Sequence, residues 1–219
     1  GGAGAGADVP AQADSRGGAG ADSAIVALGA ALAEGQRAHL DRVALWGALN
    51  LIAGAALFGA SSREEHPTRR AFGLQTAGWG AVNLGIVGWA LLAGAPEPAT
   101  TLSGALAAED RWAHILLVNL GLNVGYMAVG TALAVAAGRG LDSGPAVKGH
   151  GAAVILQGAG LMVLDGLAWA ASSGRMGALR GLVEALEGAE VAALQVRPGG
   201  YDAAAIEFAV RLPTALFGG

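Results

Sequence analysis

The sequence predicts an all-α, polytopic membrane protein, built as an antiparallel bundle of four transmembrane helices with amphipathic flanking helices. Of its 219 residues, 53% are hydrophobic and only 14% are charged, whereas soluble domains carry about 25% charged residues. Four apolar runs are each long enough to cross a bilayer as a helix. The connectors between these runs are short, so consecutive helices are expected to be antiparallel neighbours.

The boundaries of the spans and of the segments around them follow from composition. Residues 1–21 are rich in Gly and Ala and are predicted to be disordered. Residues 22–41 are predicted to form an amphipathic helix on the membrane surface. The four spans are expected at about 42–60, 72–94, 113–137 and 149–171. Residues 172–219 are predicted to form an amphipathic extension, which lies against the bundle and headgroups or docks another subunit.

Basic residues near the span ends indicate the orientation. The first and third connectors hold Arg63, Arg69, Arg70, Arg139 and Lys148. The second connector is acidic and its only basic residue is at position 111. The positive-inside rule then places connectors one and three in the cytoplasm and both termini in the periplasm. The chain begins without Met, so a removed signal peptide is expected, although a trimmed chain would begin in the same way.

The fourth span contains Asp165, the one acidic residue that lies well inside an apolar run, together with the amide Gln157. An ionisable group within the membrane is costly and has to be held by neighbouring helices, which makes it a functional candidate. A rise of about 1.5 Å per residue gives Asp165 the same depth as Asn119 on the antiparallel third span. We therefore expect Asp165 to hydrogen-bond Asn119 or its neighbours.

The first two spans share an internal repeat. The segment W-G-A-L-N-L that starts at Trp46 recurs as W-G-A-V-N-L from Trp79. Trp and Asn four residues apart lie on one helix face, and in antiparallel spans such a repeat is inverted. The predicted polar core draws on all four spans and comprises Asn50, Asn83, Asn119, Asn123, Tyr126, Gln157 and Asp165.

This polar core has three interpretations. Amides hydrogen-bond across membrane helices for about 0.6 kcal/mol each, so the core can simply hold the bundle together. It can also bind a small ligand, or it can couple the protein to protons. A single acid without an intramembrane His or second acid makes a poor proton relay, so packing is the favoured interpretation.

Small residues on several spans permit close helix approach. Internal helix packing is expected at Gly73, Ala77, Ala81, Gly85, Gly121, Gly125, Gly158 and Gly166, in preference to oligomerisation.

The composition also argues against several classes of function. No Cys is present, which excludes disulfides and thiolate metal sites, and a net charge of −4 offers no basic surface for nucleic acid. Each of the four His residues falls at a helix end or in a connector: His39, His66, His114 and His150. We therefore expect no metal, haem or pigment, whereas bound lipid is plausible. No catalytic motif is present, so no enzyme activity is expected.

Three motifs carry a resemblance to a known family. They are the repeated W-x-x-x-N pair, the segment N-L-G-L-N-V-G-Y from Asn119 to Tyr126, and Q-G-x-x-L-x-x-x-D from Gln157 to Asp165. The chain resembles an uncharacterised bacterial family of four-helix integral membrane proteins, annotated only as a domain of unknown function. The resemblance covers about residues 37–169 and implies a bacterial inner-membrane location. Members often carry Asp where this chain has Asn123, which removes one acid.

Two functional hypotheses follow. The first is a non-enzymatic membrane subunit that scaffolds or stabilises a larger membrane protein complex, with a photosynthetic or respiratory assembly as one candidate host. The second is a small transporter or a carrier of lipophilic ligands that uses the polar core around Asp165, as transporters built from inverted repeats do. The expected partners are membrane lipids and other membrane subunits. A solvent-connected polar cavity at Asp165 would favour the second hypothesis.

Overall fold

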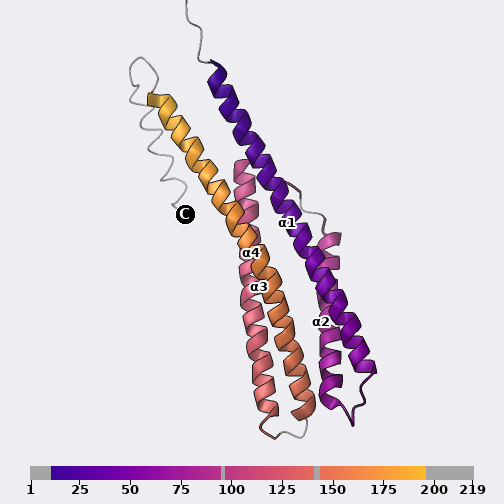
Figure 1. Ribbon diagram of the computed structural model, residues 1–219. Coiled ribbons are helices and arrows are strands. Elements are labelled where there is room, and N and C mark those ends of the chain that lie inside the picture. Colours follow the sequence, from indigo (N-terminus) through magenta and orange to yellow (C-terminus); the bar gives the residue numbers. More distant parts are fainter. Residues whose placement is uncertain (1–10, 95–96, 141–143, 196–219) are drawn as a thin grey trace, which may run out of the picture. The chain divides into compact units, whose positions relative to one another are not determined.

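The computed structural model describes residues 11–94, 97–140 and 144–195 and contains four helices (Figure 1). They are α1 (Ala11–Gly59), α2 (Pro67–Leu92), α3 (Leu102–Ala137) and α4 (Gly144–Gln195). The described residues contain no strand, which confirms the all-α fold class. The chain divides into two compact units, Gly1–Arg180 and Gly181–Gly219. The first unit holds the bundle, and in the second the described residues 181–195 are helical.

Three of the predicted segment boundaries fall inside continuous helices. The surface helix 22–41 and the first span are one continuous helix, α1, which already begins at Ala11 within the segment predicted to be disordered. The fourth span likewise continues without a break to Gln195. Residues 1–10 and 196–219 lie outside the described residues. The helices continue because α1 contains no Pro and α4 has Pro only in its first turn, at Pro145, where it is tolerated. Their buried positions also keep the same spacing on both sides of the predicted boundaries.

A seven-residue period of buried positions runs through the four helices. A strict period of this length keeps one seam of each helix facing its neighbours, with slight left-handed supercoiling. In α3 the seam includes Glu109, Leu116, Asn123 and Gly130. In α4 it includes Gly151, Gly158, Asp165, Ser172 and Leu179. The polar side chains of the bundle therefore occupy the same seam as its apolar core.

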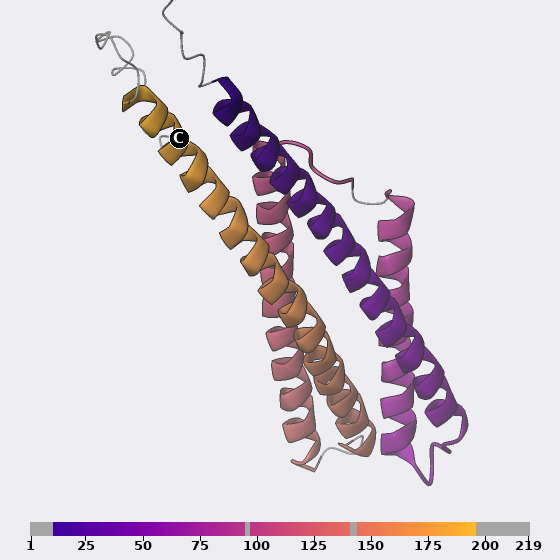
Figure 2. The same cartoon turned by 45° about the horizontal axis from the view of Figure 1, so that its top comes forward.

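Helices α1 and α2 run side by side and are packed through glycines (Figures 1 and 2). A Cβ added to Gly80 would lie 2.4 Å from the backbone nitrogen of Leu51 and 2.6 Å from the carbonyl oxygen of Gly47. The contact is reciprocal, since a Cβ on Gly47 would lie 3.1 Å from the carbonyl oxygen of Gly80. Gly54 and Gly73 oppose each other in the same way one heptad further along. The repeated W-G-A-x-N-L segment thus packs against its own copy.

The other helices close the bundle by similar contacts. A Cβ on Gly130 of α3 would lie 2.6 Å from the carbonyl oxygen of Gly151 of α4, and the reverse distance is also 2.6 Å. Helix α4 approaches α2 at Gly149, whose added Cβ would lie 2.2 Å from the carbonyl oxygen of Thr68. It approaches α1 at Gly160, which lies against the indole ring of Trp46. Helix α4 therefore contacts each of the other three helices.

The C-terminal end of α1 is capped by two arginines from the first turn of α2. The last carbonyl groups of a helix have no partner within it. The Nη1 of Arg70 donates to the carbonyl oxygens of Phe58 and Ser61, each at 3.1 Å. Arg69 donates from Nη2 to the carbonyl oxygen of Ala60 at 3.0 Å and from Nε to the Ser61 hydroxyl at 2.7 Å. This connector is therefore held by side chains that also neutralise the negative end of the helix dipole.

Three of the four helices are long and apolar enough to cross a membrane: Gly20–Gly59, Leu102–Ala137 and Gly144–Ala189. We predicted four spans, and α2 does not reach this degree of apolarity because it contains Gln75, Asn83 and several glycines. All four helices nevertheless expose large apolar side chains over one zone. This apolar belt includes Leu45 and Ile52 of α1, Val82 and Ile86 of α2, Val118 and Val129 of α3, and Val163 and Leu167 of α4.

Candidate functional site

The centre of the candidate site is an acid, a base and an amide from three helices. The Nδ2 of Asn123 donates to Oδ2 of Asp165 at 2.7 Å, and Nε2 of His39 lies 3.2 Å from Oδ1 of the same carboxyl group. His39, Asn123 and Asp165 are only 5%, 2% and 4% exposed. Asp165 is thus held by Asn123, one turn beyond the expected partner Asn119, which is half-buried. The carboxyl group receives a polar contact on each oxygen.

The position of His39 differs from the one that the sequence predicted. We expected all four His residues at helix ends or in a connector, but His39 lies in the middle of the continuous helix α1. Its place in the seven-residue series Ile25, Leu32, His39 was the signal that sequence reasoning missed. His39 also packs edge-on against Trp112 of α3, with 5.5 Å between ring centroids. The acid in this bundle therefore has a buried base beside it.

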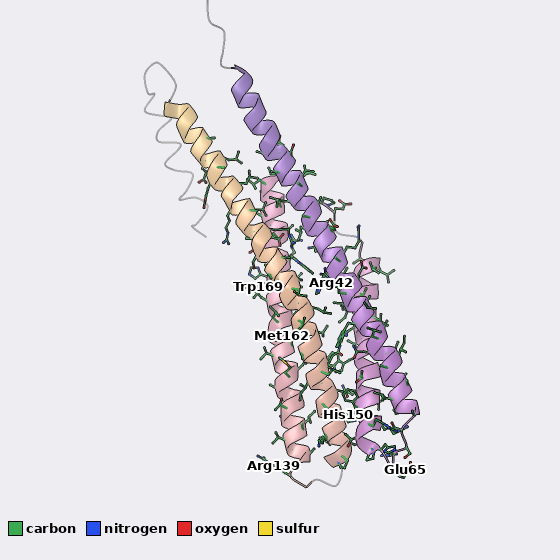
Figure 3. The ribbon with its side chains drawn as sticks, in the orientation of Figure 1. Arg42, Glu65, Arg139, His150, Met162 and Trp169 are labelled. Carbon is green, nitrogen blue, oxygen red and sulfur yellow. The ribbon has the colours of Figure 1, made fainter. Side chains whose placement is uncertain are left out.

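A cavity of about 320 Å³ lies beside this cluster and is lined by residues of α1, α3 and α4. Its lining includes Gly35 and Arg42, which flank His39 along α1, as well as Trp112 and Ala168. His39 and Asp165 do not line the cavity themselves; Trp112, which His39 contacts, and Ala168, one turn beyond Asp165, do. Arg175 also lines it. Figure 3 labels Arg42 on α1 near this level of the bundle.

A second buried cluster lies two turns further along the same seam. Arg175 of α4 donates to both carboxylate oxygens of Glu109 of α3, from Nε at 2.8 Å and from Nη2 at 3.1 Å. The Ser172 hydroxyl donates to Oε1 of Glu109 at 2.5 Å. The side chain of Glu109 is 1% exposed and that of Arg175 is 14% exposed. Glu109 falls in the second connector of the sequence prediction, which is acidic, but its spacing of seven from Leu116 places it on the α3 seam.

The remaining residues of the predicted polar core are distributed along the seams. Asn50 donates to the carbonyl oxygen of Trp46 in its own helix at 2.7 Å. Tyr126 contacts Trp79 edge-on, with 4.9 Å between ring centroids. Asn83 and Gln157 are 2% and 1% exposed. Among the described residues, no cross-helix hydrogen bond joins these amides, so of the seven the structure brings together only Asn123 and Asp165.

Several buried donors of this core lack a hydrogen-bond partner within the described residues. They are the indole nitrogens of Trp46 and Trp79, Nδ2 of Asn83 and Nε2 of Gln157; His39 Nδ1 and the Thr76 hydroxyl are also without partners. Buried polar groups in native proteins nearly always have a partner, which can be an internal water. Most of these groups are N–H donors.

The small residues expected to pack helices occupy two kinds of position. Gly73, Ala77 and Gly158 lie at close helix contacts inside the bundle. Gly85, Gly121, Gly125 and Gly166 have no heavy atom within 4 Å of an added Cβ, and Ala81 is exposed. For these five residues, the expected internal packing is wrong. Ala81, Gly85, Gly121 and Gly125 are exposed and fall between the buried positions of the seven-residue period, whereas Gly166 is half-buried next to Asp165.

No group of three His, Cys, Asp or Glu side chains that could hold a metal ion occurs among the described residues.

Comparison with known proteins identifies the family. A family model described as "Family of unknown function (DUF6992)" matches residues 42–166, more than half of the chain. The chain belongs to this family. No curated protein and no solved structure matches it. The matched DUF6992 region contains Asn123 and Asp165 but not His39 or Arg175, so both clusters combine residues inside the family match with residues outside it.

Proposed function

We propose that this DUF6992 protein is an integral membrane protein whose four helices all cross the bilayer, and that it is a non-enzymatic subunit that stabilises a larger membrane complex. The apolar belt supports the location, because a soluble protein rarely exposes so much contiguous apolar surface. Ile52 is 68% exposed, Val118 is 62% exposed and Ile86 of α2 is 57% exposed. In a bilayer, these exposed side chains contact lipid acyl chains instead of water. In this arrangement α2 crosses the bilayer together with the other three helices.

The outer face of α3 is the observation that carries the proposed role. Gly121 and Gly125 form a G-x-x-x-G pair that faces away from the bundle, between the exposed side chains of Val118 and Val129. Lipid gives little driving force between helices, so small residues on an outward face are useful where another helix approaches closely. This face fits a transmembrane helix of a partner subunit.

The test replaces the two glycines of this face and compares the result with the same substitution on another helix. Gly121→Leu/Gly125→Leu is expected to abolish co-purification of partner subunits from native membranes in mild detergent, as measured by mass spectrometry of the co-migrating proteins. Because both glycines are open, the variant protein is expected to remain folded, with a melting temperature near that of the wild type. The control is Gly85→Leu, which places the same side chain on the open face of α2 and is expected to retain the partners. A wild-type protein that migrates alone would contradict the proposal.

The His39–Asp165 pair favours a second candidate function, in which a small ligand or a proton is bound at the polar core. An imidazole and a carboxyl group in contact can bind a polar ligand between them, and here Nε2 of His39 lies 3.2 Å from Oδ1 of Asp165, with a cavity of about 320 Å³ lined by neighbouring residues. The cavity contributes Arg42, whose guanidinium suits an acidic ligand.

In this second function, Asp165→Asn is expected to keep the fold, since the amide oxygen of Asn can still accept from Asn123. It is expected to reduce proton flux into proteoliposomes, measured with an internal pH dye, to the level of protein-free vesicles. Asp110→Asn is the control, because that carboxyl group is on α3 but 64% exposed. Wild-type vesicles no leakier than protein-free ones, or flux that is unchanged by Asp165→Asn, would exclude proton coupling.

A further inference from the structure

A groove of about 760 Å³ opens at the end of the bundle that carries connectors one and three. Its walls come from the end of α1, the first connector, α2 and the start of α4, and they include Phe58, Arg63, Arg70, Leu74, Pro145 and His150. Figure 3 labels His150 near this end, with Arg139 and Glu65 on the adjoining connectors. The volume is within the range of about 300–1,000 Å³ that is typical of small-molecule sites.

The polar wall of the groove is basic. Arg63 is exposed and has no hydrogen bond or ion pair to another described residue. Arg70 is fixed by its bonds to two carbonyl groups and by the Phe58 ring, which lies 3.8 Å below its guanidinium carbon. His150 is oriented by a contact of 3.0 Å between its Nδ1 and Oε1 of Gln75. Arg70 is therefore held in place with N–H groups still available, and Arg63 is free to turn toward a ligand in the groove.

The nearby acidic residues do not cancel this charge within the groove. Glu64 and Glu65 belong to the same connector, but neither lines the groove. The backbone N–H of Glu65 donates to the Ser62 hydroxyl at 3.0 Å, and that hydroxyl donates to Oε2 of Glu65 at 3.4 Å. Arg69, Arg139 and Lys148 add further positive charge to this end of the unit. An anionic group is therefore the natural ligand of the wall.

The other wall of the groove is apolar and continues into the belt. Leu74 is 51% exposed, and Phe58 and Pro145 lie beside it along the groove. A soluble phosphate would use the arginines and leave this wall in water. An amphiphile with an anionic head uses both walls, since its first chain methylenes can lie on Leu74 while its head meets the arginines.

We propose that this groove binds an anionic phospholipid, with the phosphate on Arg63 and Arg70 and the start of an acyl chain along Phe58 and Leu74. Arginine forks recognise phosphate oxygens in a bidentate way, and basic pockets between membrane helices are known to hold anionic headgroups. The inference rests on the proposed membrane location, because the apolar wall meets lipid only if the belt is embedded.

The experiment uses the full-length protein and two kinds of lipid. The protein is first tested for flotation with liposomes. In a separate measurement, detergent-purified protein is mixed with equal amounts of phosphatidylglycerol and phosphatidylcholine of matched chains, and the lipid that it retains is identified by native mass spectrometry. Phosphatidylglycerol is expected to be retained in preference. Arg63→Gln is expected to weaken its binding about tenfold, the effect of one charged hydrogen bond. Arg139→Gln removes a charge at the same end but outside the groove, and it is expected to leave binding unchanged.

Further arms separate the sources of phosphate. Leu74→Gln is expected to weaken lipid binding with both arginines in place, and inorganic phosphate is expected not to raise the melting temperature. Stabilisation by inorganic phosphate equal to that by lipid, equal retention of the two lipids, or an equal loss in Arg139→Gln would overturn the lipid site. A protein that fails to float with liposomes would instead overturn the proposed membrane location, so the two failures are distinguishable.

Discussion

Gly80→Leu in α2 is expected to prevent stable assembly of the bundle, whereas Gly85→Leu in the same helix is expected to be tolerated. A Cβ at position 80 would lie 2.4 Å from the Leu51 backbone nitrogen, and backbone cannot move aside without separating α1 from α2. Overpacking costs about 1–3 kcal/mol and more where the obstacle is rigid, so we expect a loss at or above the top of that range. At Gly85 nothing lies within 4 Å, and replacing a helical glycine gains up to about 1 kcal/mol.

The measurement is the melting temperature of the purified variants in one detergent, together with helix content by circular dichroism. Gly80→Ala and Gly85→Ala form a milder pair, for which opposite signs are expected: destabilisation at Gly80 and slight stabilisation at Gly85. Equal effects at the two positions would show that the close α1–α2 contact is not required for the fold.

Glu109→Gln is expected to destabilise the bundle by about 3–5 kcal/mol, the usual cost of removing one partner of a buried ion pair. Arg175 would then keep its charge beside a neutral amide, in a place where its side chain is 14% exposed. The amide oxygen of Gln could still accept from the Ser172 hydroxyl, but the amide nitrogen could not accept from Arg175. The destabilisation arises because the Arg175 guanidinium stays largely buried without an opposite charge. It is expected to be far larger than the effect of Asp110→Asn, where the acid is 64% exposed and the free energy of unfolding is expected to fall by less than about 1 kcal/mol.

A double-mutant cycle tests this mechanism. Glu109→Met/Arg175→Met removes both charges and fills similar volume, and it is expected to recover most of the stability lost in either single variant. The readout is the free energy of unfolding in a denaturing-detergent titration. Additive losses in the double variant would mean that the two side chains act independently and that the ion pair is not what holds α3 to α4.

Much of the fold was predictable because apolar length is recorded directly in sequence. Helix α3 contains the third predicted span, and α2 covers all but the last two residues of the second. Asp165 was also recognised as an acid that needs a partner. The extents of α1 and α4 were missed because hydropathy falls where a helix leaves the apolar zone, although Arg42 and Ser173 interrupt nothing in the backbone. The apolar stretch that indicates a membrane span ends before the helix does. Only the seven-residue period of buried positions indicates how far the helix continues.

The candidate site was less predictable, because its chemistry depends on rotation about each helix axis as well as on depth. Depth placed Asp165 level with Asn119, but side chains lean toward the N-terminus of their helix, so Asp165 and Asn123 reach each other across a turn. His39 was assigned to a surface helix for its polar neighbours. Its spacing of seven from Leu32 and from Trp46 carries the information that it faces inward.

The shared seven-residue period has a consequence for how this chain can change in length. Inserting or deleting one residue inside a helix turns everything beyond it by about 100°, since there are 3.6 residues per turn. A single deletion between Glu109 and Asn123 would therefore rotate one polar cluster out of the bundle while leaving the other in place. Natural insertions and deletions in this family are expected in the connectors, or in steps of seven within the helices, so that alignment gaps would mark the ends of the helices.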